Sequence, residues 1–184
     1  MDVETRLELV RKPPTEEVIT DQDMRSLLEQ EEHPADYIGF EISGKLHLGT
    51  LLLSGFKFND LAKAGFKTQV WLADWHSFLN NKLEGNWEKI RTAARYYKEA
   101  FEFFCPKSRV LLANDVYHNN DEFWRDVLTF SKHMTLARAQ RTLTILGRTE
   151  RDSLQLAHFF YSPMQAVDIK LLDARVPHGG MDQR

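Results

Sequence analysis

The sequence predicts an α/β domain with a mainly parallel sheet flanked by helices. Short apolar runs rich in β-branched and aromatic residues alternate with longer segments of helical periodicity, which is the pattern of α/β proteins. Each apolar run ends in a polar or glycine-containing turn, as at the carboxyl edge of a parallel sheet. The 184 residues suffice for one well-buried domain, with a second possible only if small.

The chain is expected to begin with a helical segment over residues 1–36. Two short helices are predicted up to about Glu32, and Thr20 and Asp23 have the spacing of a capping box before the second helix. His33 and Pro34 then break the helix. The main domain is therefore expected over 37–184.

The main domain is expected to open with a strand–helix–strand unit. A strand begins at Tyr37, a turn contains Gly44, and a helix runs from about Thr50 to Ala64. This helix is apolar on most faces, so we expect it to be buried. Gly65 predicts its end, and a second strand over 68–73 completes a right-handed crossover.

The remaining elements continue the alternation. Asn86 predicts the cap of a long helix that ends before Pro106. The further expectations are a strand over 109–113, helices over 121–130 and 135–147, helical structure over 152–172 with a break at Pro163, and a short strand over 174–177.

Composition narrows the class of protein. The net charge is −3, so any contact with nucleic acid must come from a local basic patch. The single cysteine, Cys105, excludes an internal disulfide and a cysteine-based zinc site. Neither a membrane span nor a signal peptide is indicated, and a cytoplasmic protein is the simplest reading.

The turn after the first strand is a candidate phosphate site. Gly44 and Gly49 flank His47, and a helix follows at once. The unpaired N–H groups and the dipole of a helix N-terminus favour anions there, and a histidine can donate to a phosphate. A surface histidine near a turn is the alternative, because neither a G-x-G-x-x-G nor a Walker A motif occurs.

A polar stripe in an apolar segment is a candidate pocket. Tyr161, Gln165 and Asp168 fall at i, i+4 and i+7, which is one face of a helix. The alternative is that each makes an isolated solvent contact. No metal-ligand spacing, Ser/His/Asp triad or covalent nucleophile is indicated, so such a site would act by positioning and charge stabilisation.

The helix expected over 135–147 has two unlike sides. Leu136, Ala139, Leu143 and Leu146 fall on one side, and the other carries Arg138, Arg141 and Arg148. A solvated face, a contact with a phosphate backbone and a subunit interface all fit this pattern.

Five segments of the sequence, considered together, are specific enough to indicate a family. They are Tyr37-Ile-Gly-Phe-Glu41 with Ser-Gly-Lys-Leu-His47-Leu-Gly-Thr50, Leu72-Ala-Asp-Trp-His76, Thr135-Leu-x-Arg-x-x-Arg141, Tyr161-x-x-Met-Gln-x-x-Asp168, and Gly179-Gly-Met-Asp-Gln-Arg184. They resemble the class I aminoacyl-tRNA synthetases, specifically tyrosyl-tRNA synthetases of the archaeal/eukaryotic type, over nearly the whole chain.

The resemblance implies a Rossmann-like fold with an inserted helical dimerisation segment, here approximately 114–155, and a homodimer. It also implies ATP-dependent activation of tyrosine to tyrosyl-adenylate and transfer to tRNA(Tyr). ATP would enter as its Mg²⁺ complex, with no permanently bound cofactor or metal.

The resemblance further implies roles for individual residues. His47 and Thr50 would be catalytic members of the "HIGH" signature, and Tyr37 with Asp168 would read the substrate hydroxyl. The other implied tyrosine contacts are Glu41, His76, Tyr161, Gln165 and Gln183. The implied ATP contacts are Gly44, His47, Gly49, Thr50, Gly180 and Asp182, and the implied tRNA contacts are Arg141 and Arg184. Phenylalanine would leave the buried Tyr37 and Asp168 unpaired, an effect for which tyrosine-specific synthetases are the established example.

Two departures and three alternatives accompany this reading. Thr50 stands where the signature's name expects histidine, and the chain ends before the family's "KMSKS" loop, so we expect a fragment with weak or no activity of its own. The alternatives are a tryptophanyl-tRNA synthetase, a non-catalytic tRNA- or nucleotide-binding paralogue, and a nucleotidylyltransferase.

Overall fold

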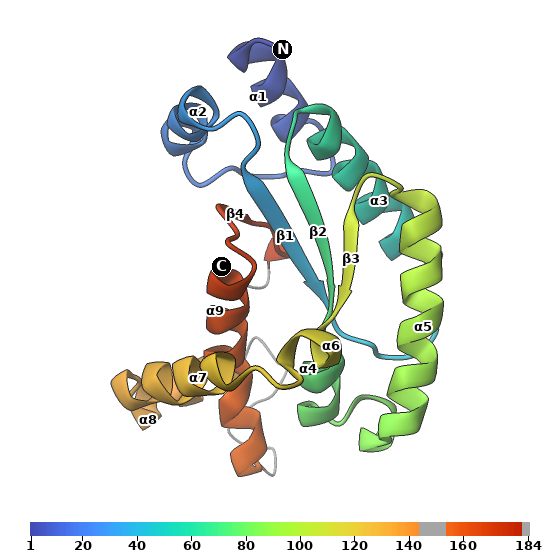
Figure 1. The fold of residues 1–184 in the computed structure, drawn as a ribbon, viewed down its shortest axis with the longest axis vertical. Coiled ribbons are helices and arrows are strands. Elements are labelled where there is room, and N and C mark those ends of the chain that lie inside the picture. Colours follow the sequence, from blue (N-terminus) through green and yellow to red (C-terminus); the bar gives the residue numbers. More distant parts are fainter. Residues whose placement is uncertain (144–153, 182–184) are drawn as a thin grey trace.

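The computed structural model describes residues 1–143 and 154–181, and in this part of the chain four strands form one all-parallel sheet (Figure 1). The strand order is β3-β2-β1-β4. Their bounds are β1 Ala35–Phe40, β2 Lys67–Leu72, β3 Arg109–Leu112 and β4 Val176–Pro177. The predicted α/β class and the parallel sheet are confirmed.

The predicted helices are present in the described residues, and short helices that were not predicted follow the second and third strands. The helices of the first half are α1 (Val3–Arg11), α2 (Asp21–Gln30), α3 (Leu48–Lys63), α4 (Asp74–Leu79), the 3-10 helix η1 (Lys82–Gly85) and α5 (Trp87–Phe104). Those of the second half are α6 (Ala113–Tyr117), α7 (Asp121–His133), α8 (Leu136–Thr142), the 3-10 helix η3 (Leu156–Phe160) and α9 (Tyr161–Leu171). None of these described helices is long and apolar enough to cross a membrane.

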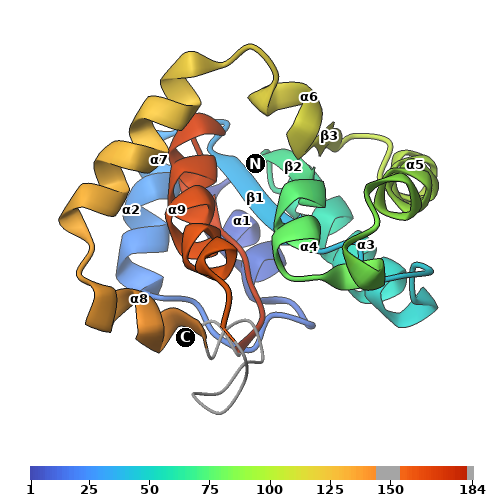
Figure 2. The ribbon, with the colours of Figure 1, turned by 90° about the horizontal axis from the view of Figure 1, so that it is seen from below.

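The sheet separates two cores, because strand side chains alternate between its faces. On one face α3 and α5 cover a core that contains Val70, Leu72 and Phe101. On the other face α6, α7 and α9 cover Tyr37 and Trp71. Seen along the sheet, α9 lies between α7 and α4 (Figure 2). This second face therefore places the polar stripe of α9 against the strands.

Two buried cations join the N-terminal helices to each other and to α3. The guanidinium of Arg6 donates to the backbone carbonyls of Ala64, Leu28, Glu31 and Glu32 at 2.8–3.2 Å. The ammonium of Lys57 on α3 donates to the carbonyls of Leu9, Val10 and Lys12 at 2.7–2.9 Å. Both cations donate to carbonyls at helix ends, which lack a partner within their own helix.

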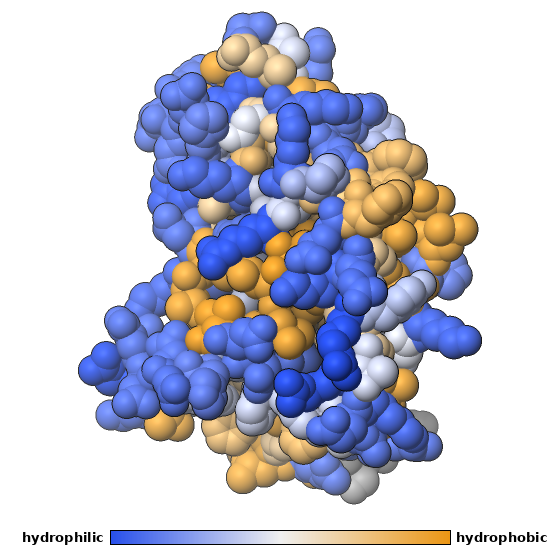
Figure 3. Space-filling model, turned by 45° about the vertical axis from the view of Figure 1, so that its right-hand side comes forward, coloured by the Kyte–Doolittle hydropathy of each residue, from blue (hydrophilic) through white to orange (hydrophobic). Residues whose placement is uncertain are grey.

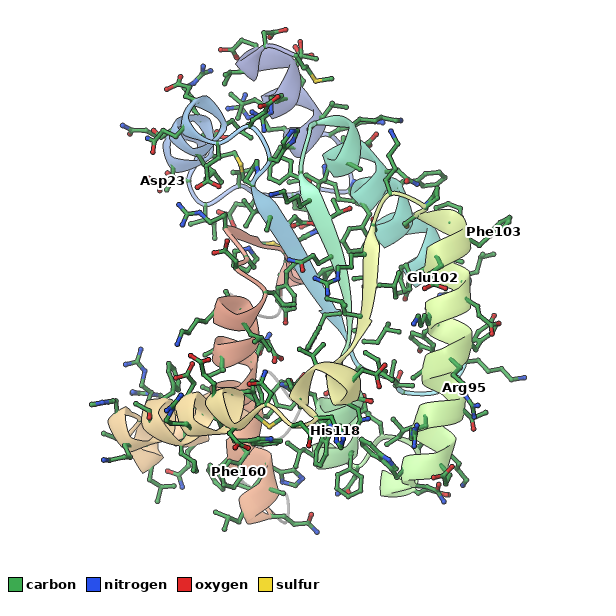
Figure 4. The ribbon with its side chains drawn as sticks, viewed as in Figure 1. Asp23, Arg95, Glu102, Phe103, His118 and Phe160 are labelled. Atoms are coloured by element: carbon green, nitrogen blue, oxygen red, sulfur yellow. The ribbon has the colours of Figure 1, made fainter. Side chains whose placement is uncertain are left out.

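The expectation that the helix after Thr50 is buried was wrong for one side of α3. Leu53 is 59% exposed and Phe56 is 56% exposed, while Phe58 and Leu61 are buried in the core. Phe103 of α5 is 88% exposed and points away from the sheet (Figure 4). The molecular surface around α3 and α5 accordingly shows apolar areas among hydrophilic ones (Figure 3). The prediction failed because a helix that packs on one face of a sheet buries only one of its sides, even when apolar residues occur on most of them.

The helix break that was predicted at Pro163 lies instead between Phe160 and Tyr161. The 3-10 helix η3 ends at Phe160 and α9 begins at Tyr161, so Pro163 stands in the first turn of α9. Proline is tolerated there because the N–H groups of the first turn have no partner within the helix. The predicted end of the preceding helix, including Leu146 and Arg148, lies outside the described residues.

Candidate active site

Predicted site residues and further polar residues, from the ends of three strands and from one helix, meet at the carboxyl edge of the sheet. Glu41 and the His47 turn follow β1, Asp74 and His76 follow β2, and Asn114 with Tyr117 follows β3. Helix α9 crosses this edge and contributes Tyr161, Gln165 and Asp168. In open parallel sheets this edge is where ligands bind.

His47 is the N-cap of α3, and its ring is already oriented. Its Nδ1 accepts a hydrogen bond of 3.0 Å from the backbone N–H of Gly49. An accepting Nδ1 requires the proton of the neutral ring to be on Nε2, which is left as a donor. A Cβ at position 49 would lie 2.9 Å from that Nδ1. Gly49 is therefore needed for the orientation of His47, a reason additional to the ATP contact that the resemblance implies for it.

The turn before α3 also requires a glycine. Gly44 has a φ of +150°, a conformation that side chains disfavour. Thr50 lies in the first turn of the helix and is half-buried. Gly44, His47 and Thr50 thus surround a helix N-terminus with backbone and side-chain donors, the arrangement expected of a phosphate site.

Tyr37, Gln165, Glu41 and Tyr161 form two hydrogen-bonded pairs. The hydroxyl of Tyr37 is bonded to the side chain of Gln165, and that of Tyr161 to Glu41. Burial is the main cause that raises the pKa of both tyrosine hydroxyls, so both remain neutral donors. The stripe of α9 therefore faces β1 and the turn after it.

Glu41 is held by two residues that the sequence reading missed. Its carboxylate accepts from Asn80 Nδ2 at 3.0 Å and pairs with Lys82 Nζ at 3.0 Å. Asn80 and Lys82 follow α4, in a loop where Asn81, Leu83 and Glu84 have left-handed φ angles. Nothing in the residue pattern joins this loop to Glu41.

Asp168 is completely buried and accepts two hydrogen bonds from residues that the sequence reading missed. Its Oδ2 accepts from Trp71 Nε1 at 3.1 Å, and its Oδ1 accepts from the Tyr117 hydroxyl at 2.5 Å. Burial raises the pKa of Asp168 to about 7, while the two hydrogen bonds act in the opposite direction. Asp168 is thus a polar acceptor inside an apolar core.

A glycine in β1 makes room for this cluster. Gly39 stands beside Trp71 in the sheet, and a Cβ at Gly39 would lie 2.9 Å from the Tyr37 hydroxyl. A glycine in a strand interior often marks close approach of another group. Gly39 is therefore a feature of the sequence that is consistent with large side chains converging here.

His76 lies next to Asp168 as a neutral ring. Its Nε2 is 3.7 Å from Asp168 Oδ2, and its ring meets that of Tyr161 edge-on at 4.6 Å. Burial lowers the pKa of His76 to about 4, so the pair is no ion pair at neutral pH. His76 lines the predicted site and shapes it by packing.

Asp74 joins β2 to α6. Its Oδ1 accepts from the backbone N–H groups of Trp75 at 2.8 Å and Asn114 at 3.1 Å, and burial raises its pKa to about 7. These bonds fix the start of α6, the helix that carries Tyr117. Asp74 belongs to the segment from Leu72 to His76 that carries the family resemblance, but no role was predicted for it.

The other predicted residues lie beside the site, away from it, or outside the described residues. Gly180 lines a cavity of about 900 Å³ beside β4, together with Tyr37, Gly39 and Gln165. Arg141 is an exposed residue of α8, the short helix after α7 (Figure 1). Asp182, Gln183 and Arg184 lie outside the described residues. Within residues 1–143 and 154–181, no group of His, Cys, Asp or Glu is arranged to hold a metal ion.

The fold and the edge site define an α/β domain with a candidate ligand site at the carboxyl edge of a parallel sheet, and comparison with known proteins gives the family. The family described as tRNA synthetases class I (W and Y) matches residues 29–184. The chain belongs to this family.

Named relatives and solved structures agree with this family assignment. The chain is 45% identical to tyrosine–tRNA ligase 1 of Pyrobaculum aerophilum, over 100% of this chain and 52% of that protein. The crystal structure of tyrosyl-tRNA synthetase from Pyrococcus horikoshii complexed with L-tyrosine is 42% identical, with a TM-score of 0.92 over 100% of this chain and 52% of that one. Tryptophanyl-tRNA synthetase of Plasmodium falciparum is 18% identical, covers 91% of this chain and 46% of that one, and its TM-score of 0.66 shows the fold alone. The chain spans about half the length of the curated relatives that it matches.

Proposed function

We propose that the protein, at the full length of its relatives, activates tyrosine with ATP and transfers it to tRNA(Tyr). This chain would supply the first half of the catalytic site. The observation that carries the proposal is the buried Asp168 carboxylate beside Tyr37, on a helix that crosses the carboxyl edge of the sheet. A buried acceptor at that place suits a ligand that carries a hydroxyl on an apolar ring.

The reaction requires no covalent protein intermediate. The carboxylate oxygen of tyrosine attacks the α-phosphorus of ATP, the bond to the β-phosphate breaks, and pyrophosphate leaves. A hydroxyl at the 3′ end of the tRNA then attacks the tyrosyl carbonyl, and AMP leaves. His47 Nε2–H, the Thr50 hydroxyl and the N-terminus of α3 would stabilise the charge on the phosphates during the first step.

The remaining residues take the roles implied by the resemblance. Tyr37 and Asp168 would bind the phenol of the substrate. Glu41, His76, Tyr161, Gln165 and Gln183 would line the rest of the tyrosine site, and Gly44, Gly49, Gly180 and Asp182 would approach ATP, which enters as its Mg²⁺ complex. Arg141 and Arg184 would contact tRNA, and residues 114–155 would form the insertion that joins two copies in a cytoplasmic homodimer.

Tyrosine-dependent exchange of pyrophosphate into ATP tests this proposal. The assay is run on this chain and on a chain that continues to the length of the relatives, with tyrosine, tryptophan or phenylalanine. We expect exchange with tyrosine in the longer chain and little or none in the shorter one. Exchange driven by tryptophan instead, or none with any amino acid in the longer chain, would contradict the proposal.

A further inference from the structure

The Asp168 carboxylate is fixed from two directions by residues far away in the chain. Trp71 lies on β2 and Tyr117 on α6, so the donors are separated from Asp168 by 97 and 51 positions. Each donor bonds a different carboxylate oxygen. Two donors on two oxygens restrict rotation of the carboxyl group, and each oxygen retains a further lone pair.

Both donors are themselves rigidly packed. The Tyr117 ring is stacked on Phe123, with ring centroids 3.9 Å apart and planes at 16°, and meets Trp124 edge-on at 5.8 Å. Trp71 is 0% exposed and lies 5.8 Å from the Tyr117 ring. The position of the carboxylate is therefore set by the core of this sheet face and not by α9 alone.

No cation among the described side chains pairs with Asp168. His76 is the nearest basic group, and its ring is neutral as described above. The other titratable groups that act on this site are the tyrosines Tyr37, Tyr117 and Tyr161 and the carboxyl of Asp74. The position of the carboxylate thus depends on neutral donors. Trp71 and Tyr117 are the two that donate hydrogen bonds to it directly.

We propose that Trp71 and Tyr117 are positioning residues that hold the Asp168 carboxylate in the geometry that accepts the phenolic hydroxyl of substrate tyrosine. The inference rests on the proposed function and deepens it, because it assigns tyrosine selectivity to a three-residue cluster. Loss of either donor leaves Asp168 in place and lets its carboxylate turn toward the remaining donor. The substrate hydroxyl then meets a misaligned acceptor.

The substitutions Tyr117→Phe and Trp71→Phe test the proposal, each made in the protein at the full length of its relatives. Each keeps an aromatic ring and removes one donor. We expect KM for tyrosine in pyrophosphate exchange to rise about tenfold or more, the range for a hydrogen bond to a charged group, with kcat changed much less. Discrimination between tyrosine and phenylalanine should fall by a similar factor.

A pH profile separates positioning from mere core stability. The Tyr117 hydroxyl lowers the pKa of Asp168, so Tyr117→Phe should raise that pKa. Because the ionised carboxylate is the acceptor, tyrosine affinity falls as the pH drops through this pKa. The midpoint of that loss should move upward by roughly one pH unit in the variant.

Trp124→Phe is the matched control. Trp124 packs against the same Tyr117 ring but donates no hydrogen bond to Asp168, so its KM and pH midpoint should stay at the wild-type values. Thermal melting monitors the fold of every variant, and Trp71→Phe decides the test if Tyr117→Phe does not fold.

Three results would overturn the proposal. They are folded Phe variants with wild-type KM and pH midpoint, equal effects of Trp124→Phe, and failure of both Phe variants to fold. A wild-type protein that shows no tyrosine-dependent exchange would instead remove the proposed function on which this inference rests.

Discussion

At the scale of residues, two buried carboxyl groups, Asp36 on β1 and Asp168 on α9, have opposite surroundings. Asp168 accepts hydrogen bonds from two side-chain donors, whereas among the described residues no side chain donates to Asp36 and the backbone N–H of Tyr37 acts on its carboxyl. Both are 0% exposed. A buried polar group without a partner costs free energy of folding, while one with partners can serve as a site.

Asp168→Asn should remove most tyrosine affinity while the chain stays folded. The asparagine amide has one acceptor oxygen, so it cannot accept from both Trp71 and Tyr117 and also from a substrate hydroxyl. The complete burial of Asp168 makes asparagine a better test than alanine, which would leave a cavity and two unpaired donors. Calorimetric titration with tyrosine should show about a hundredfold loss of affinity or more, in the range of a truncated buried polar contact. An unchanged dissociation constant would disprove the assignment.

Asp36→Asn should stabilise the chain, and more so at higher pH. Burial raises the pKa of Asp36 to about 8, well above its value in an unfolded chain. The group therefore favours the folded state fully below about pH 4, and this contribution is lost as the pH rises toward 8. Urea unfolding should show a gain of about 2 kcal/mol or more at pH 8 and little gain at pH 4. A gain that is the same at both pH values would contradict this account.

At the scale of elements, the helices and strands follow from the residue pattern, but which faces become buried does not. Caps behaved as predicted, since Thr20 caps α2 and Asn86 caps α5. The exposed side of α3 could not be predicted. The pattern of apolar residues identifies the buried face of a helix only when the opposite face is polar, and α3 has apolar residues on most faces. The contact between α3 and α5 decides which side of α3 is buried. At Gly55 of α3 this contact is so close that a Cβ would lie 2.3 Å from the Phe104 ring of α5.

Arg6→Met should cost far more stability than Arg11→Met, although both arginines lie on α1. Arg6 is 6% exposed and bonds four backbone carbonyls, which would lose their partners on substitution. Arg11 forms an exposed ion pair with Asp21 at 2.9 Å. Denaturant unfolding should show a loss of about 3 kcal/mol for Arg6→Met and under about 0.5 kcal/mol for Arg11→Met. Equal losses would show that the carbonyl contacts of Arg6 do not hold α1.

At the scale of the whole molecule, local motifs predicted where the site lies but not what fixes it. The carboxyl edge and the stripe of α9 follow from the alternation of strands and helices. The contacts of Trp71 and Tyr117 with Asp168 depend on how β2, α6 and α9 meet in space, and no spacing rule brings together residues 51 and 97 positions apart. The role of the exposed arginines of α8 likewise depends on the whole molecule, because it is set by whether tRNA or a second subunit contacts them.

Arg141→Ala should weaken tRNA binding by the protein at the length of its relatives, in a salt-dependent way. A phosphate contact releases counterions, so its loss should reduce the slope of log K against log salt by about 1. Arg95→Ala on α5, another exposed arginine, is the matched control and should leave binding unchanged. If Arg141→Ala instead dissociates a dimer without an effect on tRNA, the side of α8 that carries the arginines is a subunit interface.

The most direct test of the central claim is calorimetric titration of the protein, at the length of its relatives, with tyrosine, phenylalanine and tryptophan. The cluster around Asp168 predicts that tyrosine binds and that the other two bind at least about a hundredfold more weakly, because neither brings a phenolic hydroxyl to the buried carboxylate. Equal affinity for phenylalanine, or stronger binding of tryptophan, would contradict the account.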